Sequence, residues 1–179
     1  MKIIDCFMYF DEDHLLEIRL NTLNDFVDKF VIVEANLDHA GNFRKPQFNM
    51  ENFSKFEKKI KYILIKDLPA HNNFYKKNWG PAWRRENLQR NALSKGYEDC
   101  NPEDLIMISD LDEIPNPLKI SQFTNKNKYG CFVQKNFLYK FNLLNVDEPK
   151  WYGTRICRKK DLKNPQWLRE IKARKMPFY

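Results

Sequence analysis

Residues 104–117 read DLIMISDLDEIPNP, a strand-like run that leads directly into a cluster of acidic residues. The almost unbroken apolar first half predicts a buried strand over 104–109. Three carboxylates, Asp110, Asp112 and Glu113, follow at once, and prolines mark the end of the turn behind them. The stretch therefore predicts a core strand that ends in an acidic turn.

The apolar residues elsewhere in the chain alternate between strand-like and helix-like periods. Strand-like runs cover 2–10, 29–35 and 59–69, and helix-like runs cover 11–25 and 82–95. Such alternation is typical of a largely parallel sheet. Two further strand-like runs, 129–144 and 151–160, follow each other without a helix between them. We therefore predict an α/β fold whose mixed, mostly parallel central sheet is flanked by helices and carries C-terminal antiparallel strands.

Composition and charge limit the class of protein. The chain has 179 residues, of which 42% are hydrophobic and 31% charged, as in a single globular domain. Its net charge of +7 favours anionic partners. Four cysteines stand far apart, which indicates buried thiols rather than a zinc site. The N-terminus is strand-like rather than a signal peptide, and no apolar run approaches the roughly 18 residues of a membrane span, so we expect a soluble, cytoplasmic protein.

The acidic turn requires positive charge nearby. Two like charges about 4 Å apart repel by about 4 kcal/mol at an effective dielectric constant near 20. In an extended Asp-x-Asp, Asp110 and Asp112 point to one side and Leu111 turns toward the core. Two hard oxygen ligands on one side favour Mn²⁺ or Mg²⁺ carried on a diphosphate. Arginine or lysine side chains are the other source of charge, and a solvated turn that only caps the next helix is the structural alternative.

A basic helix precedes this strand. Its sequence, WGPAWRRENLQRNALSKG, places Arg84 and Asn87 on one side and Glu86 and Arg90 on another. If the helix packs beside the strand, these polar groups reach the acidic turn, where arginine can pair with a phosphate. The alternative is that Glu86 and Arg90 form only a surface ion pair. Trp79, Trp83 and Trp151 are candidates for an aromatic platform for sugar, although tryptophan more often packs in a core.

Three segments carry a family resemblance: FVIVEANLDHAG, WRRENLQRNAL and above all LIMISDLDEIPNP resemble glycosyltransferase family 17. The resemblance implies one GT-A-like domain over 1–179, with a nucleotide-sugar part at 1–125 and acceptor-side strands at 126–179. It implies a UDP-sugar donor, which is UDP-N-acetylglucosamine in the known members, a glycan acceptor and inversion at the anomeric carbon. It also implies Mn²⁺ (or Mg²⁺) at Asp110 and Asp112.

The resemblance and the mechanism together assign roles to further residues. Inversion requires a carboxylate that takes the proton of the acceptor hydroxyl, and the candidates are Glu113, Asp147 and Glu148. His39 is a weaker candidate for a ligand or a base. Donor binding is assigned to carboxylate, amide and basic side chains around the sheet edge: Glu34, Asn36, Lys45, Arg84, Arg85, Asn87, Arg90 and Asp110.

Three other functions remain open at this point. A nucleic-acid-binding module would use the basic clusters and aromatics, but the sequence shows no recognisable module of that kind, and we expect no nucleic-acid partner. A phosphotransferase or nucleotidyltransferase can share a two-carboxylate metal site. The family pattern continues into an acceptor-side segment containing Trp-His-Phe that these 179 residues lack, so a degenerate protein that binds the donor without transferring the sugar is the third alternative.

Overall fold

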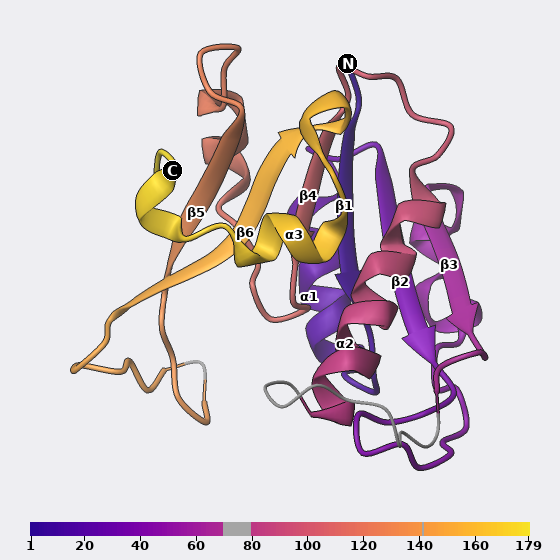
Figure 1. Cartoon of the computed structure of the whole chain (residues 1–179). Helices are drawn as coiled ribbons and strands as arrows, with labels where there is room; N and C mark the ends of the chain where they lie inside the picture. The colour runs from indigo at the N-terminus through magenta and orange to yellow at the C-terminus, as the bar shows by residue number, and fades with distance from the viewer. Residues whose placement is uncertain (70–79, 141) are drawn as a thin grey trace.

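The computed structural model describes residues 1–69, 80–140 and 142–179, and it contains one six-stranded mixed sheet (Figure 1). The strands follow the order β3-β2-β1-β4-β6-β5 across the sheet. They are β1 (Ile3–Met8), β2 (Lys29–Ala35), β3 (Ile60–Ile65), β4 (Leu105–Ser109), β5 (Tyr129–Lys135) and β6 (Lys150–Arg158). Strands β1 to β4 pair in parallel, whereas β6 pairs antiparallel to both β4 and β5. The predicted α/β class and mixed sheet are confirmed, and the GT-A assignment stays a prediction.

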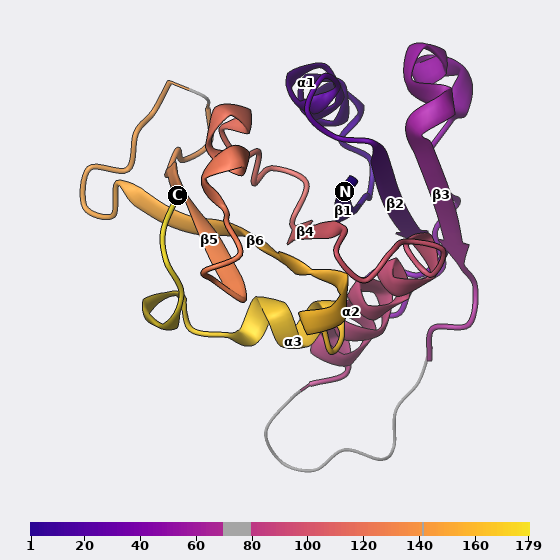
Figure 2. The ribbon, with the colours of Figure 1, turned by 90° about the horizontal axis from the view of Figure 1, so that it is seen from above.

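Helices cover both faces of this sheet (Figure 2). Helix α1 (Asp13–Leu23) and the 3₁₀ run η1 (Met50–Lys59) pack on one face, and α2 (Pro81–Asn91), η2 (Ala92–Gly96) and α3 (Pro165–Glu170) pack on the other. Strand β4 is buried along its whole length, because it lies in the middle of the sheet with side chains on both faces. This explains why its sequence is continuously apolar rather than alternating. Three short 3₁₀ segments complete the list: η3 (Pro117–Gln122), η4 (Lys159–Asp161) and η5 (Ala173–Lys175).

Helix α2 ends earlier than its sequence predicts, and a close approach explains the glycine at its end. The chain continues beyond Asn91 as the 3₁₀ segment η2, which ends at Gly96. A Cβ atom at Gly96 would lie 2.1 Å from Cγ1 of Val31 in β2. Only glycine therefore lets this turn pack directly on the sheet.

The C-terminal part departs most from the predicted elements. The strand predicted over 129–144 ends at Lys135, and the chain then forms an irregular loop in which Tyr139 has a φ of 63°. That left-handed conformation breaks an extended run. The last residues return to the sheet edge, where Tyr179 N donates to the carbonyl oxygen of Cys131 over 3.0 Å. Helix α3 and η1 were not predicted.

Two expectations about the core and the membrane can be compared with the structure. All four cysteines are buried free thiols, as predicted. Within the described residues, no helix combines the length and the apolar character that a bilayer crossing requires. The connection between the predicted strand over 59–69 and the predicted helix over 82–95 falls almost wholly outside the described residues.

Candidate active site at the acidic turn

The acidic turn begins where β4 ends, at the edge of the sheet where parallel strands have their carboxyl ends. The amide of Glu113 donates to the carbonyl oxygen of Asp110 over 3.1 Å, which closes the turn. Leu111 is buried between Asp110, which is half-buried, and Asp112, which is exposed. The prediction that Leu111 turns into the core is confirmed.

Asp110 is paired with two arginines from different helices. Arg90 of α2 places Nη2 3.0 Å from Oδ1, and Arg169 of α3 places Nη2 2.9 Å from Oδ2. Burial alone would raise the pKa of the Asp110 carboxyl, but the charges of Arg169 and Arg90 outweigh burial, so that the pKa lies below its usual value. Asp110 is therefore an ionised carboxylate whose two oxygens are both engaged.

Glu113 is buried and fully hydrogen-bonded. Arg169 donates from Nη1 to Oε2 over 2.7 Å and from Nη2 to Oε1 over 2.9 Å. Trp151 Nε1 donates to Oε1 over 2.7 Å, and the backbone amide of Asp110 donates to Oε2 over 3.0 Å. A carboxylate offers about four lone-pair positions, and these four bonds use them all. Glu113 thus joins α3, β6 and the turn.

Asp112 contrasts with both neighbours. Among the residues that the structure describes, no cation pairs with its carboxylate and no other residue donates a hydrogen bond to it. Desolvation on the protein side of the turn raises the pKa of Asp112, and the negative charges of Glu113 and Asp110 raise it further. Within the described part of the chain, the turn therefore presents one carboxylate without a positive partner.

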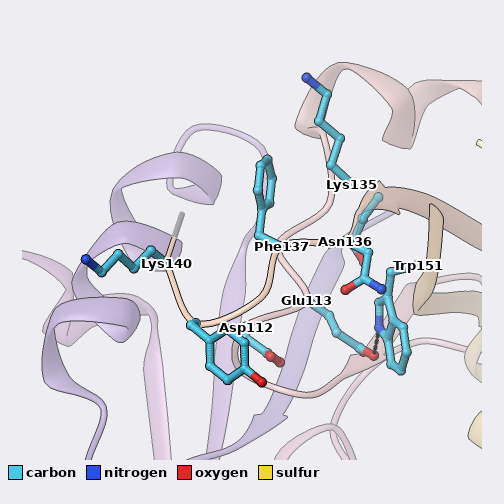
Figure 3. A pocket seen from close by; sticks show the side chains of 9 residues that line it. Asp112, Glu113, Lys135, Asn136, Phe137, Lys140 and Trp151 are labelled. Atoms are coloured by element: carbon cyan, nitrogen blue, oxygen red, sulfur yellow. Dashed lines mark hydrogen bonds between the residues drawn. The ribbon is translucent and has the colours of Figure 1, made fainter. Parts of the chain in front are cut away.

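Two cavities meet at Asp112. The first, here called the edge cavity, has a volume of about 660 Å³ and lies at the sheet edge among Tyr9, His39, Gln89, Arg90, Asp110 and Asp112. The second, here called the hairpin cavity, has a volume of about 560 Å³ and lies against the loop after β5, among Asp112, Glu113, Lys135, Phe137, Lys140 and Trp151. Figure 3 shows Glu113 and Trp151 pointing toward each other, with the hydrogen bond between them, and Asp112 nearby in the hairpin cavity. Volumes of this size are typical of small-ligand sites.

The donor atoms of the turn are compatible with a divalent cation held largely by a ligand. Mg²⁺ and Mn²⁺ are commonly bound by one or two carboxylates together with substrate phosphates and water. Asp112 supplies one such carboxylate, whereas both oxygens of Asp110 face guanidinium groups. Within the described ranges, no group of three or more His, Cys, Asp or Glu side chains is placed to hold a metal by itself. Of the predicted pair, Asp112 is the one whose carboxylate has no cationic partner among the described residues, and metal binding by Asp110 and Asp112 stays a prediction.

Comparison with known proteins agrees with these observations. The family description "Glycosyltransferase family 17" matches residues 1–165. The chain belongs to glycosyltransferase family 17.

Curated relatives of this family 17 chain cover part of its length. A human protein named β-1,4-mannosyl-glycoprotein 4-β-N-acetylglucosaminyltransferase is 28% identical over 119 residues, which are 64% of this chain and 22% of that protein. The proteins of the same name from Rattus norvegicus and Mus musculus are 28% and 27% identical over the same shares. This family 17 chain therefore spans about a fifth of the length of the curated relatives that it matches.

Two residues predicted to bind the donor have structural partners in this family 17 chain. Glu34 is fully buried, and its carboxylate accepts from Arg44 Nη1, from the amides of Gln47 and Phe48, and from the hydroxyl of Tyr62. These bonds hold the loop after β2. Arg85 is likewise buried, and it donates to the carbonyl oxygens of His39 and Pro69. Both side chains bind neighbouring loops and belong to the described lining of neither cavity, and their predicted contact with the donor stays a prediction.

The remaining predicted residues divide between the cavities and other places. Arg90 and Asp110 line the edge cavity, and Glu113 lines the hairpin cavity. The other candidates do not belong to the described lining of either cavity: Asn36 is half-buried, Asn87 is buried, and Lys45, Arg84, Asp147 and Glu148 are exposed.

The predicted aromatic platform is represented by one residue. Trp151 lines the hairpin cavity, with its ring nitrogen on Glu113. Trp83 lies on α2 and is not part of the described cavity linings, and Trp79 lies outside the described residues. Of the pairing alternatives, Glu86 does form the ion pair with Arg90, over 2.7 Å, but the same Arg90 nitrogen also binds Asp110.

Sequence reasoning missed two arginines that contact the acidic turn. Arg169 lies on a helix of six residues, which is too short to give a periodic pattern, although Asn164 and Pro165 before it are a usual helix start. Arg19 lies in α1, where an arginine among apolar residues reads as an exposed position, yet its side chain is fully buried. The available signal is the position of Arg19 on the same helical stripe as the buried Leu16 and Leu20, because a buried arginine requires an acidic partner inside the protein.

Proposed function

We propose that this chain is an inverting glycosyltransferase of GT-A-like fold that transfers N-acetylglucosamine from a UDP-sugar to a glycan acceptor. The observation that carries the proposal is the position of Asp112, which borders two adjoining cavities and has no cationic partner among the described residues. A transferase must bring two substrates together at one point. The names of the three relatives support N-acetylglucosamine as the transferred sugar and a mannose-containing glycan as the acceptor.

In this proposal the edge cavity receives the donor. Ligands of open α/β sheets gather at the carboxyl ends of the strands, which is where this cavity lies. Asp112 is the residue that would hold Mn²⁺ or Mg²⁺, which when bound neutralises charge on the departing diphosphate. The raised pKa of Asp112 supports this assignment, because a carboxylate that is disfavoured in its ionised form gains most from a bound cation.

Among the basic residues that the structure describes, Arg90 is best placed to bind the donor phosphates. It lines the edge cavity, and its Nε atom is a buried donor without a hydrogen-bond partner among the described residues. Its other nitrogens bind Glu86, Asp110 and Gln166. A phosphate oxygen is a strong acceptor for a guanidinium N–H. Asp110 would then serve to hold Arg90 in place rather than to bind the cation directly.

The acceptor is assigned to the hairpin cavity. Trp151 and Phe137 offer flat apolar faces, and Gln134 and Asn136 offer amides that can hydrogen-bond sugar hydroxyls. Glu113 is the one predicted base that borders this cavity. It can accept a proton from the acceptor hydroxyl only if one of its four hydrogen bonds is released, and the bonds from Arg169 are the natural ones to yield.

A panel of nucleotide sugars tests this function. The protein is incubated with UDP-, GDP- and CMP-sugars, with and without Mn²⁺, in the presence and absence of mannose-containing glycan acceptors. We expect UDP-N-acetylglucosamine to give acceptor-dependent release of UDP and a glycan that is heavier by one N-acetylhexosamine. Binding of the donor without any transfer would instead support the non-catalytic alternative, and indifference to every UDP-sugar would overturn the proposal.

A further inference from the structure

Arg19 lies fully buried beneath the acidic turn and binds its backbone. From α1, its Nη1 atom donates to the carbonyl oxygens of Asp110, Leu111 and Glu113 over 3.1, 3.0 and 3.2 Å. These carbonyls flank Asp112 on both sides, whereas the Asp112 carbonyl accepts from the amide of Ile114. One guanidinium group therefore contacts the turn before and after the carboxylate that borders both cavities.

The position of this guanidinium is itself fixed by the sheet. Asp5 of β1 accepts from Nε over 2.8 Å and from Nη2 over 2.7 Å, and Ser109 of β4 accepts from Nη2 over 2.5 Å. The ring of Phe7 lies 4.5 Å from the guanidinium carbon. Phe7 pairs with Ser109 in the register of β1 and β4, so the side chains that contact Arg19 come from two adjacent central strands of the sheet.

A requirement for stability alone is a weak explanation for this arrangement. A buried ion pair loses much solvation, and apolar side chains of similar volume often serve equally well or better. What apolar side chains cannot do is satisfy three carbonyl oxygens that point inward from one turn. The planar fork of arginine meets this need and, unlike a lysine, fixes several acceptors relative to one another.

We propose that Arg19, held by Asp5, is a positioning residue that sets the place of the Asp112 carboxylate between the edge cavity and the hairpin cavity. Arg19 does not line either cavity and acts through the backbone of the turn. The inference rests on the proposed function, since it concerns how Asp112 binds a cation and the donor. Its consequence is that replacement of Arg19 weakens the steps that depend on Asp112 more than it weakens acceptor binding, which Trp151 and Phe137 also support.

The variant Arg19→Lys tests this role. It keeps a positive charge for Asp5 but presents three N–H groups on one atom, too few and too close together for the six acceptors. Supporting groups behind a metal ligand typically change metal affinity or activity about 10- to 100-fold. We expect Mn²⁺ affinity, measured by electron paramagnetic resonance titration, to fall at least about tenfold. We also expect kcat for donor hydrolysis to fall, while KM for the acceptor changes by a smaller factor than Mn²⁺ affinity does.

Lys59→Met is the matched control. Lys59 is another cation that binds backbone carbonyls, those of Asn24 and Val27, but it is the last residue of η1, just before β3, and lines neither cavity. We expect this variant to lower the thermal midpoint without changing Mn²⁺ affinity or kcat. If Arg19→Lys behaves in the same way as Lys59→Met, Arg19 is only a structural residue and the inference is wrong.

Two further measurements keep the test decisive. If Arg19→Lys does not fold, Ser109→Ala removes a single acceptor of Arg19, and we expect a smaller loss of Mn²⁺ affinity; an unchanged affinity overturns the inference. Asp112→Asn separates the two claims. If Asp112→Asn itself binds Mn²⁺ and donor as the wild type does, the proposed function fails. The role of Arg19 is then decided by hydrogen exchange at the amides of Glu113 and Ile114, which accelerates in Arg19→Lys if Arg19 holds the turn and is unchanged if it does not.

Discussion

Arg169 and Asp110 are joined across 59 positions of sequence by a contact of 2.9 Å between Nη2 and Oδ2. The same guanidinium binds both carboxylate oxygens of Glu113 and the carbonyl oxygen of Gly153. Helix α3 is thereby tied to the acidic turn and to β6. The C-terminal part of the chain thus helps to hold the residues at which the two cavities meet.

Replacement of Arg169 by glutamine tests the strength of this connection. Glu113, whose side chain is 3% exposed, would lose its charged partner, and breaking a buried pair in this way costs about 3–5 kcal/mol. We expect the free energy of unfolding in urea to fall by about 3 kcal/mol and the thermal midpoint to fall by roughly 10 °C.

A double variant controls for the simple loss of packing. In Arg169→Gln with Glu113→Gln, neither a buried cation nor a buried anion lacks its partner. We expect this protein to be more stable than the sum of the two single effects by about 0.5–3 kcal/mol. Strict additivity of the two substitutions would show that the pair is not coupled.

Asp112 gives a pH dependence of known sign. Its folded-state pKa is raised above the unfolded value, so the folded state binds a proton more tightly than the unfolded state does. The contribution of Asp112 to the free energy of unfolding therefore falls as pH rises from its pKa in the unfolded state to its pKa in the folded state. The contribution stays low at neutral pH. We expect Asp112→Asn to raise the thermal midpoint at pH 7 by about 1–2 °C, with the gain vanishing as pH falls through that window.

Asp38 provides a control of opposite sign on an exposed loop. Hydrogen bonds from the side chain and the amide of Asn42 lower the pKa of Asp38. Its stabilising effect is present above the unfolded pKa and is lost as pH falls through the folded pKa. Asp38→Asn should therefore lower the thermal midpoint at pH 7. Equal shifts in the same direction for Asp38→Asn and Asp112→Asn would contradict the assigned signs.

Glu34 is expected to organise the loop after β2. In Glu34→Gln the side chain keeps its size but loses one acceptor oxygen and the negative charge that pairs with Arg44. We expect hydrogen exchange at the amides of Gln47 and Phe48 to accelerate at least about tenfold, since each donates to this carboxylate. Exchange in β4, on the far side of β1, serves as the internal reference and should stay unchanged.

Substitutions of Trp151 test whether the hairpin cavity binds the acceptor rather than the donor. Trp151→Phe keeps a ring in the hairpin cavity but removes the donor to Glu113, and Trp151→Ala removes both. If the ring supports a sugar, we expect KM for the acceptor to rise about tenfold in Trp151→Ala and much less in Trp151→Phe. Donor hydrolysis without acceptor should change little in either variant, and a selective loss of donor binding would count against the assignment of the two cavities.

The strands were the most predictable part of the fold. Central parallel strands are buried on both faces, so their sequences are short apolar runs, and β2 and β4 were found within one residue of their predicted bounds. The strand predicted over 129–144 was too long, because its aromatic residues suit an exposed loop that borders a cavity as well as they suit a strand. Tyr139 with its positive φ could not be foreseen from composition.

The candidate site was predictable only in part, because local sequence does not show which charges pair. Asp110 and Asp112 differ by two positions and have the same chemistry, yet Arg90 and Arg169 engage one and leave the other. Arg169 reaches the turn through a long-range contact that no spacing rule describes. Arg90 was found because it lies on a helix that precedes β4 and packs against the sheet.

Donor hydrolysis by Asp112→Asn, with Asp147→Asn as control, tests the central claim most directly. Both substitutions remove one exposed carboxylate, but Asp147 lies outside the described lining of both cavities. Release of UDP from UDP-N-acetylglucosamine is measured with Mn²⁺ together with calorimetric binding of the donor. The account predicts that Asp112→Asn loses at least about 100-fold in kcat/KM, or about 2.7 kcal/mol, whereas Asp147→Asn retains wild-type values. Donor binding and hydrolysis by Asp112→Asn at the wild-type level would contradict it.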